Sequence, residues 1–315
     1  MDSENQTQVT EFILLGITDK QELEFILFGV LLPVYLITLS ANMLIIMVVL
    51  VNRHLQTPMY FFLCNLSFLD ICYSSTSLPK SLKDFFLERK TISFGGCMAQ
   101  MYISLSLGMV ECFLLAVMAC DRYVAICHPL NYTIIMNWAV CIKIAISAWV
   151  AGFLLSVISL IFTVFLPFCG HNRINHSTCE IRAVVILACA DIRLMELIGF
   201  VTSVFVLIVP FCIIIFSYAQ IIVAILKISS VDGRFKAFST CTSHLTVVIL
   251  FYGTAIVTYL RPRSMVSEEK DKIVSMFYGA FIPMLNPLIY TLRNNDVKGA
   301  LRKTTGTKLF SLIGR

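Results

Sequence analysis

The sequence predicts an all-α membrane protein, a seven-transmembrane helix bundle with a short amphipathic C-terminal helix. Of the 315 residues, 58% are hydrophobic and only 14% are charged. A water-soluble fold of this size cannot hide so much apolar surface, and a disordered chain needs the opposite composition. Seven apolar runs supply the spans, because each exceeds the roughly 20 residues that a helix needs to cross a bilayer. The runs leave no room for a second globular domain.

The segment before the first run, residues 1–24, is polar and acidic, and we expect it to be an extracellular N-terminal tail. It lacks the basic start and the short apolar core of a cleaved signal peptide. The first span should therefore act as an uncleaved anchor.

The seven apolar runs are predicted to be helices rather than barrel strands. In hydrocarbon, backbone polar groups must be paired within helices or a closed barrel, and membrane barrel strands have only about 10 residues. Residues 25–292 would then form one transmembrane domain. We place its spans at residues 25–51, 58–80, 97–123, 139–166, 194–226, 237–260 and 271–292.

Two segments outside the spans have a recognisable character. The connection over about residues 167–193 is the longest and holds Cys169, Cys179 and Cys189. Residues 293–315 are polar and basic, and Val297, Ala300 and Leu301 are placed at helical spacing among Lys298, Arg302 and Lys303. This pattern predicts a cytoplasmic tail with a short amphipathic helix that lies on the membrane.

The N-terminal tail and the cysteines predict the orientation across the membrane. Lysines and arginines divide evenly between the two sides, so the positive-inside rule does not decide it. Asn5-Gln6-Thr7 is a glycosylation acceptor in the tail, and Asn175-His176-Ser177 is a second one on the same side. Cysteines at this side favour an oxidising compartment, where disulfides form. We therefore place the N-terminus outside the cell, in a multi-pass plasma membrane protein glycosylated at Asn5.

Several polar side chains fall within the predicted spans. Asp70 and Glu111 lie deep in the second and third spans, where a charge costs about 3 kcal/mol or more. Either they are structural polar groups, protonated or hydrogen-bonded inside the bundle, or they form a cation or proton site. Asn42 should also face the interior, close to Asn286.

Two motifs near the predicted cytoplasmic side suggest segments that change conformation. Asp121-Arg122-Tyr123 ends the third span, and its adjacent opposite charges can pair locally or separate. In the last span, Pro283 and Pro287 each remove a backbone hydrogen bond, so the helix has a weak point there. We expect the cytoplasmic half of this span, with Tyr290, to move relative to the outer half.

Other function classes lack a sequence signal. There is no nucleophile triad, phosphate loop or HExxH motif of an enzyme, and no basic cluster with interleaved aromatics that would bind nucleic acid. We predict no cofactor and no metal site, since the cysteines near His171 and His176 are better explained by disulfides. A channel filter and the internal repeats of a transporter are also missing.

Four long motifs, in order, closely resemble the odorant receptors, a subfamily of the rhodopsin-like G-protein-coupled receptors. The moderate length of the loop at 167–193 is similar to that of the class II group. Cys120, where the family usually has Tyr, and Cys64 depart from the pattern, which puts basal activity and packing in doubt rather than the family. The matching segments are Pro58-Met59-Tyr60-Phe61-Phe62-Leu63, residues 118–130 around Asp121-Arg122-Tyr123, residues 236–245, and Pro283-Met284-Leu285-Asn286-Pro287-Leu288-Ile289-Tyr290.

The resemblance implies two disulfides and a ligand pocket. Cys97 should bridge to Cys179, and Cys169 to Cys189. The pocket should lie between the third, fifth, sixth and seventh spans, with Tyr259 and Tyr252 as the foremost ligand contacts. Its implied lining is Met101, Ser104, Leu105, Gly108, Met109, Thr202, Ser203, Val206, Tyr252, Ala255, Ile256 and Tyr259.

The resemblance also implies a function. A small volatile odorant would bind in the bundle and activate a stimulatory heterotrimeric G protein of the olfactory type, raising cyclic AMP. A same-family receptor for a metabolite outside the olfactory epithelium, and a membrane transporter, are the alternatives. The residues implied in switching and G-protein coupling are Asp121, Arg122, Tyr123, Tyr218, His244, Asn286, Pro287 and Tyr290.

Overall fold

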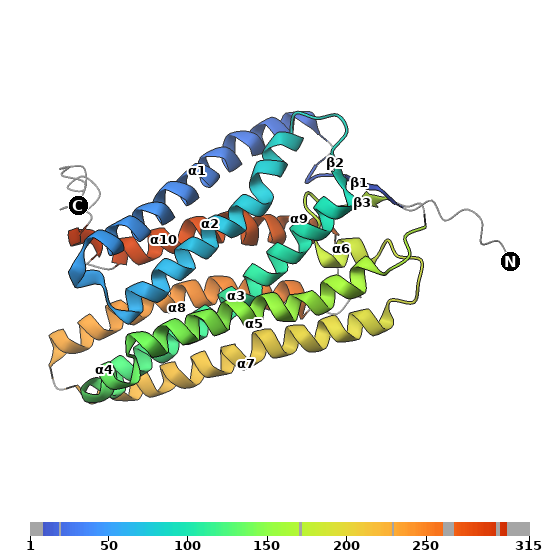
Figure 1. The fold of residues 1–315 in the computed structure, drawn as a ribbon. Helices are drawn as coiled ribbons and strands as arrows, with labels where there is room; N and C mark the ends of the chain where they lie inside the picture. The colour runs from blue at the N-terminus through green and yellow to red at the C-terminus, as the bar shows by residue number, and fades with distance from the viewer. Residues whose placement is uncertain are drawn as a thin grey trace.

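The computed structural model describes residues 9–18, 20–169, 172–228, 230–260, 268–293 and 297–300. In this part of the chain the long helices lie side by side as a bundle (Figure 1). The first six spans are α1 (Gln21–Val51), α2 (Pro58–Asp84), α3 (Phe94–Cys127), α5 (Trp138–Val164), α7 (Arg193–Leu226) and α8 (Val231–Tyr259). The seventh consists of α9 (Glu268–Met276), the π-helical turn η4 (Phe277–Phe281) and α10 (Ile282–Arg293).

Short elements connect the long helices at the two ends of the bundle. They are η1 (Arg53–Leu55), η2 (Pro129–Asn131), α4 (Tyr132–Ile135) and α6 (Ile181–Val185). Figure 1 shows α4 at one end and α6 at the other, beside the strands. The loops that the sequence places on different sides of the membrane thus lie at opposite ends of the bundle. This is the arrangement of a multi-pass membrane protein.

α2 differs from the other spans because it is not strongly apolar. Among the described residues, six helical segments are both long enough and apolar enough to cross a membrane, and α2 is not one of them. Its polar side chains face the interior instead of lipid, with Ser67, Asp70 and Ser74 all buried. Interior polar contacts therefore compensate for its low hydropathy, as expected for polar groups in a membrane protein.

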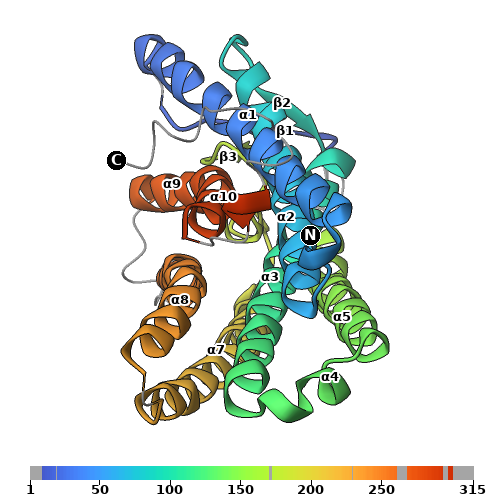
Figure 2. The same ribbon diagram turned by 90° about the vertical axis from the view of Figure 1, so that its left-hand side faces the viewer.

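α3 is the central helix of the bundle. It packs against α2, α5, α7 and α8, and Figure 2 shows it between its neighbours. In the apolar 18-residue segment of α3, 61% of the residues are buried. The corresponding share in α7 is 22%, so much of the surface of α7 is free to contact lipid. At Gly152 of α5 a Cβ would lie 2.5 Å from Val110 Cγ2 of α3, so only glycine allows this close approach.

A small sheet covers the end of the bundle that carries α6. Strand β1 (Glu11–Leu14) pairs antiparallel with β2 (Thr91–Ser93) and parallel with β3 (Arg173–Ile174). Phe12 and Leu14 of β1 are buried, and the Phe12 ring packs against that of Phe168 at 5.6 Å between centroids. Part of the segment predicted to be a polar tail is thus an ordered strand.

The seventh span is irregular slightly before the predicted weak point. The π-helical turn Phe277–Phe281 precedes Pro283, and α10 continues through Pro287. Such turns often occur at functional sites because they reorient side chains. After this span, residues 297–300 are helical, with Val297 and Ala300 buried in the core. Leu301, Arg302 and Lys303 lie outside the described residues.

Candidate functional site

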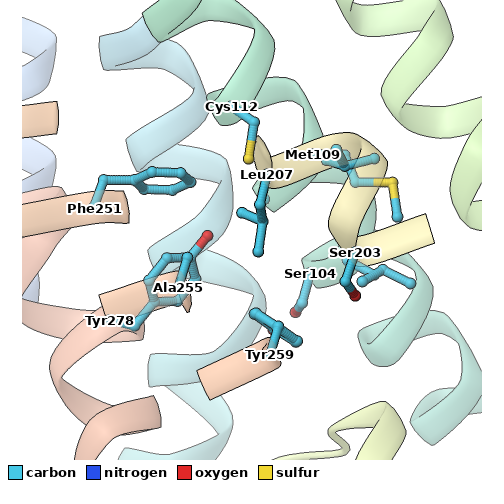
Figure 3. A pocket seen from close by; sticks show the side chains of 12 residues that line it. Ser104, Met109, Cys112, Ser203, Leu207, Phe251, Ala255, Tyr259 and Tyr278 are labelled. Carbon is cyan, nitrogen blue, oxygen red and sulfur yellow. The ribbon is translucent and has the colours of Figure 1, made fainter. Parts of the chain in front are cut away.

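The main cavity lies between α3, α7, α8 and the π-helical turn of the seventh span (Figure 3). The space in it that atoms do not fill measures about 430 Å³, open solvent included. Its lining residues are Ser104, Leu105, Gly108, Met109, Cys112, Ser203, Val206, Leu207, Phe251, Ala255, Tyr259 and Tyr278.

The structure brings most of the lining implied by the resemblance into this one cavity. The residues in common are Ser104, Leu105, Gly108, Met109, Ser203, Val206, Ala255 and Tyr259. Met101 lines a second cavity instead, while Thr202 and Ile256 lie half-buried away from the wall.

Tyr252 was expected to contact a ligand, but the structure places it elsewhere. Its side chain is 1% exposed, and its hydroxyl donates to the carbonyl oxygen of Cys112 at 3.0 Å. The ring of Phe251 packs against it at 5.2 Å, and Phe251 is the residue of this pair that lines the cavity. Tyr252 therefore joins α8 to α3, and it is not among the residues that line the cavity.

Four lining residues escaped the sequence analysis: Cys112, Leu207, Phe251 and Tyr278. Cys112 lies one helical turn beyond Gly108, so the helical period was a usable signal for it. Tyr278 had no such signal, because the π-helical turn aims it at the cavity. A Cβ at Gly108 would lie 3.0 Å from the Tyr278 hydroxyl, so this glycine provides the room for that ring.

The cavity wall is apolar except for a few hydroxyl groups. No charged side chain lines it among the residues that the structure describes. Figure 3 shows the hydroxyls of Ser104 and Ser203 directed into the same part of the cavity, near Tyr259. A buried site of this kind favours an uncharged ligand, since burying an unpaired charge is costly.

A second cavity adjoins the first on the side of α6. The space in it that atoms do not fill measures about 460 Å³, open solvent included. It shares Ser104, Leu105 and Tyr259 with the main cavity. Its other walls come from Tyr73, Met101 and the outer loop segment, defined here as residues 179–182. This segment brings the charged side chains Glu180 and Arg182 above the apolar site.

The outer loop segment is tied to three helices. Cys179 forms a disulfide with Cys97 of α3, and Glu180 accepts a hydrogen bond from Ser275 of α9. The Arg182 guanidinium donates to the carbonyl oxygens of Thr258 at 2.6 Å and Tyr259 at 2.8 Å, at the end of α8. These carbonyls have no partner within the helix. A second disulfide joins Cys169 to Cys189.

The predicted polar side chains within the bundle form one buried cluster. The Asn286 amide donates to both oxygens of Asp70, at 3.1 and 3.2 Å, and the Asn42 amide donates to the Pro283 carbonyl at 3.1 Å. Glu111 is 3% exposed, and its Oε1 has no hydrogen-bond partner in the described part of the chain. No set of three potential metal ligands occurs in that part either.

Near the C-terminal end of α3, the Asp121-Arg122-Tyr123 motif makes local contacts. Arg122 Nη2 lies 3.6 Å from Asp121 Oδ2, and the Tyr132 hydroxyl donates to Asp121 Oδ1 at 2.8 Å. Burial, followed by the charge of Asp121, raises the pKa of Tyr132 well above its usual value. Tyr132 therefore remains a neutral donor at physiological pH. Tyr123 contacts His128, with 3.2 Å between its hydroxyl and Nε2.

Tyr218 and His244 connect α7 and α8 near the same end. The Tyr218 hydroxyl lies 2.8 Å from His244 Nδ1, and His244 Nε2 lies 3.1 Å from the Leu115 carbonyl oxygen of α3. The Leu115 carbonyl accepts a hydrogen bond, so Nε2 carries the proton and Nδ1 accepts from Tyr218. Tyr290 is buried, and its hydroxyl has no partner among the described residues. Asn5 lies outside the described residues.

Comparison with known proteins identifies the sequences that this chain resembles. The sequence profile named olfactory receptor matches residues 31–308. Human olfactory receptor 13C9 is 49% identical over 317 aligned residues, which cover 99% of this chain and 100% of the relative. Human olfactory receptor 2D2 is 51% identical over 299 residues, covering 95% of this chain and 96% of the relative.

Proposed function

Because the chain belongs to the olfactory receptor family, we propose that it binds small volatile odorants in the main cavity and activates a G protein. The G protein would be the stimulatory heterotrimeric type of olfactory neurons, so that cyclic AMP rises. The receptor would act in the plasma membrane, with its N-terminus and the 167–193 connection outside the cell. Family membership also agrees with the prediction that the chain is not an enzyme.

The observation that carries the proposal is the uncharged cavity between α3, α7, α8 and the seventh span. Its wall combines apolar side chains with a few hydroxyls, which suits a small molecule of low polarity. The outer loop segment lines the second cavity beside it, so it would help to shield a bound ligand from water on that side.

α8 provides a physical route from the cavity to the cytoplasmic end. Phe251, Ala255 and Tyr259 of this helix line the cavity, and His244 of the same helix contacts α3 and α7. The fifteen residues from His244 to Tyr259 span about 22 Å of helix. A ligand that fits best with a displaced α8 would shift the population toward the state in which the His244 contacts are broken.

The inner contacts suit a receptor that switches between two states. Within the described chain, Arg122 forms one ion pair, with the neighbouring Asp121 at 3.6 Å, and the buried Tyr290 hydroxyl has no hydrogen-bond partner. A rearrangement that frees Arg122 and gives Tyr290 a partner would open a surface for the G protein. Asp121, Arg122, Tyr218 and Tyr290 are the residues that we assign to this step.

The disulfides support the proposed orientation. Cys97–Cys179 and Cys169–Cys189 both lie at the end of the bundle that carries the sheet. Disulfides persist in an oxidising compartment, so this end should face the outside. Protease protection of an epitope tag at the N-terminus in intact cells would test the orientation.

A cyclic AMP assay in cells tests the function. Cells that display the receptor would be exposed to a panel of volatile compounds, with surface staining as the measure of expression. Arg122→Ala is the matched control, because it should reach the surface and lose signalling. A surface-expressed receptor that raises no cyclic AMP with any compound would contradict the proposal.

A further inference from the structure

The two serines of the main cavity differ in the hydrogen bonds that they can still make. Ser203 Oγ donates to the carbonyl oxygen of Gly199 at 2.7 Å, one turn earlier in α7. Its single proton is thereby used within the helix. Toward the cavity, Ser203 presents only the lone pairs of its oxygen, so it can accept a hydrogen bond but not donate one.

Ser104 has the opposite capacity. Its hydroxyl makes no hydrogen bond within the described residues, although it lines both cavities and is half-buried. It therefore has a proton to donate, while Ser203 has an acceptor to offer. Figure 3 shows both hydroxyls directed into the same part of the cavity.

The remaining wall restricts what a ligand can be. Met109, Leu207 and Phe251 surround the serines with apolar surface, and no charged side chain of the described chain lines the cavity. The tyrosines of the wall are Tyr259 and Tyr278, which carry neutral hydroxyls. An ammonium or carboxylate group would lose its hydration there without an ionic partner.

We propose that the ligands of this cavity are uncharged apolar alcohols, whose hydroxyl donates to Ser203 and accepts from Ser104. This assignment rests on the proposed receptor function and names its ligand class. An alcohol uses both serines, whereas an aldehyde or a methyl ether of the same skeleton can only accept, from Ser104. A hydrocarbon uses neither serine, and the hydrocarbon body of each compound occupies the apolar wall.

The first test compares matched compounds on the unchanged receptor. Hexanol, octanol, geraniol and benzyl alcohol are each assayed beside the corresponding aldehyde and methyl ether, with octanoic acid and octylamine as charged members. Cyclic AMP is measured against concentration in cells with equal surface staining. We expect the active alcohol to be about fivefold more potent than its aldehyde and ether, for the one additional hydrogen bond. The acid and the amine should be inactive.

The second test separates the two serines. Ser203→Ala should abolish the advantage of the alcohol while leaving the aldehyde and ether as potent as before. Ser104→Ala should weaken alcohol, aldehyde and ether alike, because all three accept from it. Ser40→Ala is the matched control, since Ser40 makes the same kind of bond, to the Leu36 carbonyl at 2.7 Å, on the exposed face of α1. It should change no potency.

Three outcomes would overturn the ligand class while keeping the receptor function. One is an alcohol no more potent than its methyl ether, and another is a Ser203→Ala receptor that loses potency equally for both. A response confined to the charged compounds would overturn it as well. Silence to the whole panel, from receptor shown to be at the cell surface, would overturn the receptor function itself.

Discussion

The outer and inner ends of the bundle are held together by different kinds of bond. At the outer end, two disulfides, a three-stranded sheet and the two hydrogen bonds of Arg182 join the loops to α3 and α8. At the inner end, the described contacts between helices are single hydrogen bonds such as Tyr218 with His244. The comparison suggests that the outer end holds a ligand in a fixed frame while the inner end changes conformation.

The energies of these bonds support the same division. A disulfide that closes a loop as long as the one from Cys97 to Cys179, 82 residues apart, destabilises the unfolded chain by about 4.5 kcal/mol in the entropic account. A neutral hydrogen bond contributes about 1 kcal/mol net. Ligand binding can therefore shift the inner contacts without disturbing the outer ones.

The largest effect should come from breaking the outer frame at Cys179. Cys179→Ser removes the disulfide to α3 and releases the outer loop segment, so we expect nearly complete loss of receptor from the cell surface. Cys212→Ser is the matched control, because Cys212 is a free, exposed cysteine of α7. Surface staining measures both variants. Normal expression of Cys179→Ser would show that the outer frame does not depend on this bond.

A second substitution loosens the outer end without removing a covalent bond. Arg182→Ala leaves the carbonyls of Thr258 and Tyr259 without their charged donor, and we expect the ligand concentration for half-maximal response to rise about tenfold. Basal cyclic AMP should not change. Arg193→Ala is the control, since its only described ion pair is a 3.9 Å contact with Asp191 at the surface. Equal effects of both changes would mean that Arg182 acts only through its charge.

The inner end can be loosened at Tyr218. Tyr218→Phe removes the hydrogen bond to His244, so the arrangement seen here loses a contact between α7 and α8. We expect basal cyclic AMP to rise about threefold to tenfold, without added ligand. Tyr35→Phe, which removes a hydroxyl contact to Ser75 on the outer surface of the bundle, should leave basal signalling unchanged. A fall in basal activity for Tyr218→Phe would assign this bond to the active state.

The smallest expected effect concerns Tyr132. Tyr132→Phe removes one hydrogen bond to Asp121, which retains its ion pair with Arg122, so basal cyclic AMP should rise by about twofold. Because the Tyr132 pKa lies above its usual value, the phenol stays protonated, and the effect should be the same at pH 6 and pH 8. A difference between the wild-type and Tyr132→Phe receptors that disappears at pH 8 would contradict this.

The sequence predicts the helices well because their length in apolar residues is set by the bilayer. The exception is instructive, since α2 satisfies the pattern only loosely and depends on interior partners for Asp70 and its serines. Strand β1 could not be predicted, because four residues form a strand only when β2 and β3 are beside them in space. Its apolar residues, Phe12 among them, were the one available sign.

The site was predictable where the family resemblance implies the position and the helix is regular. Ser104, Gly108 and Ala255 are such cases. Tyr278 was not predictable, because a π-helical turn shifts the register of its side chain. Tyr252 was expected in the pocket because the family resemblance implies it, but its hydroxyl donates to a carbonyl oxygen of the adjacent α3. Contacts with neighbouring helices decide whether a tyrosine faces the cavity, and sequence spacing does not reveal those contacts.

Distances measured in the purified receptor, with and without an activating volatile, test the central claim most directly. Spin labels at Lys143 of α5 and Thr242 of α8 report on the inner end, and labels at Ile161 and Val257 of the same helices report on the outer end. All four positions are exposed. We expect the ligand to lengthen the inner distance and leave the outer one unchanged. A ligand that changes the outer distance, or neither, would contradict a fixed outer frame with a moving inner end.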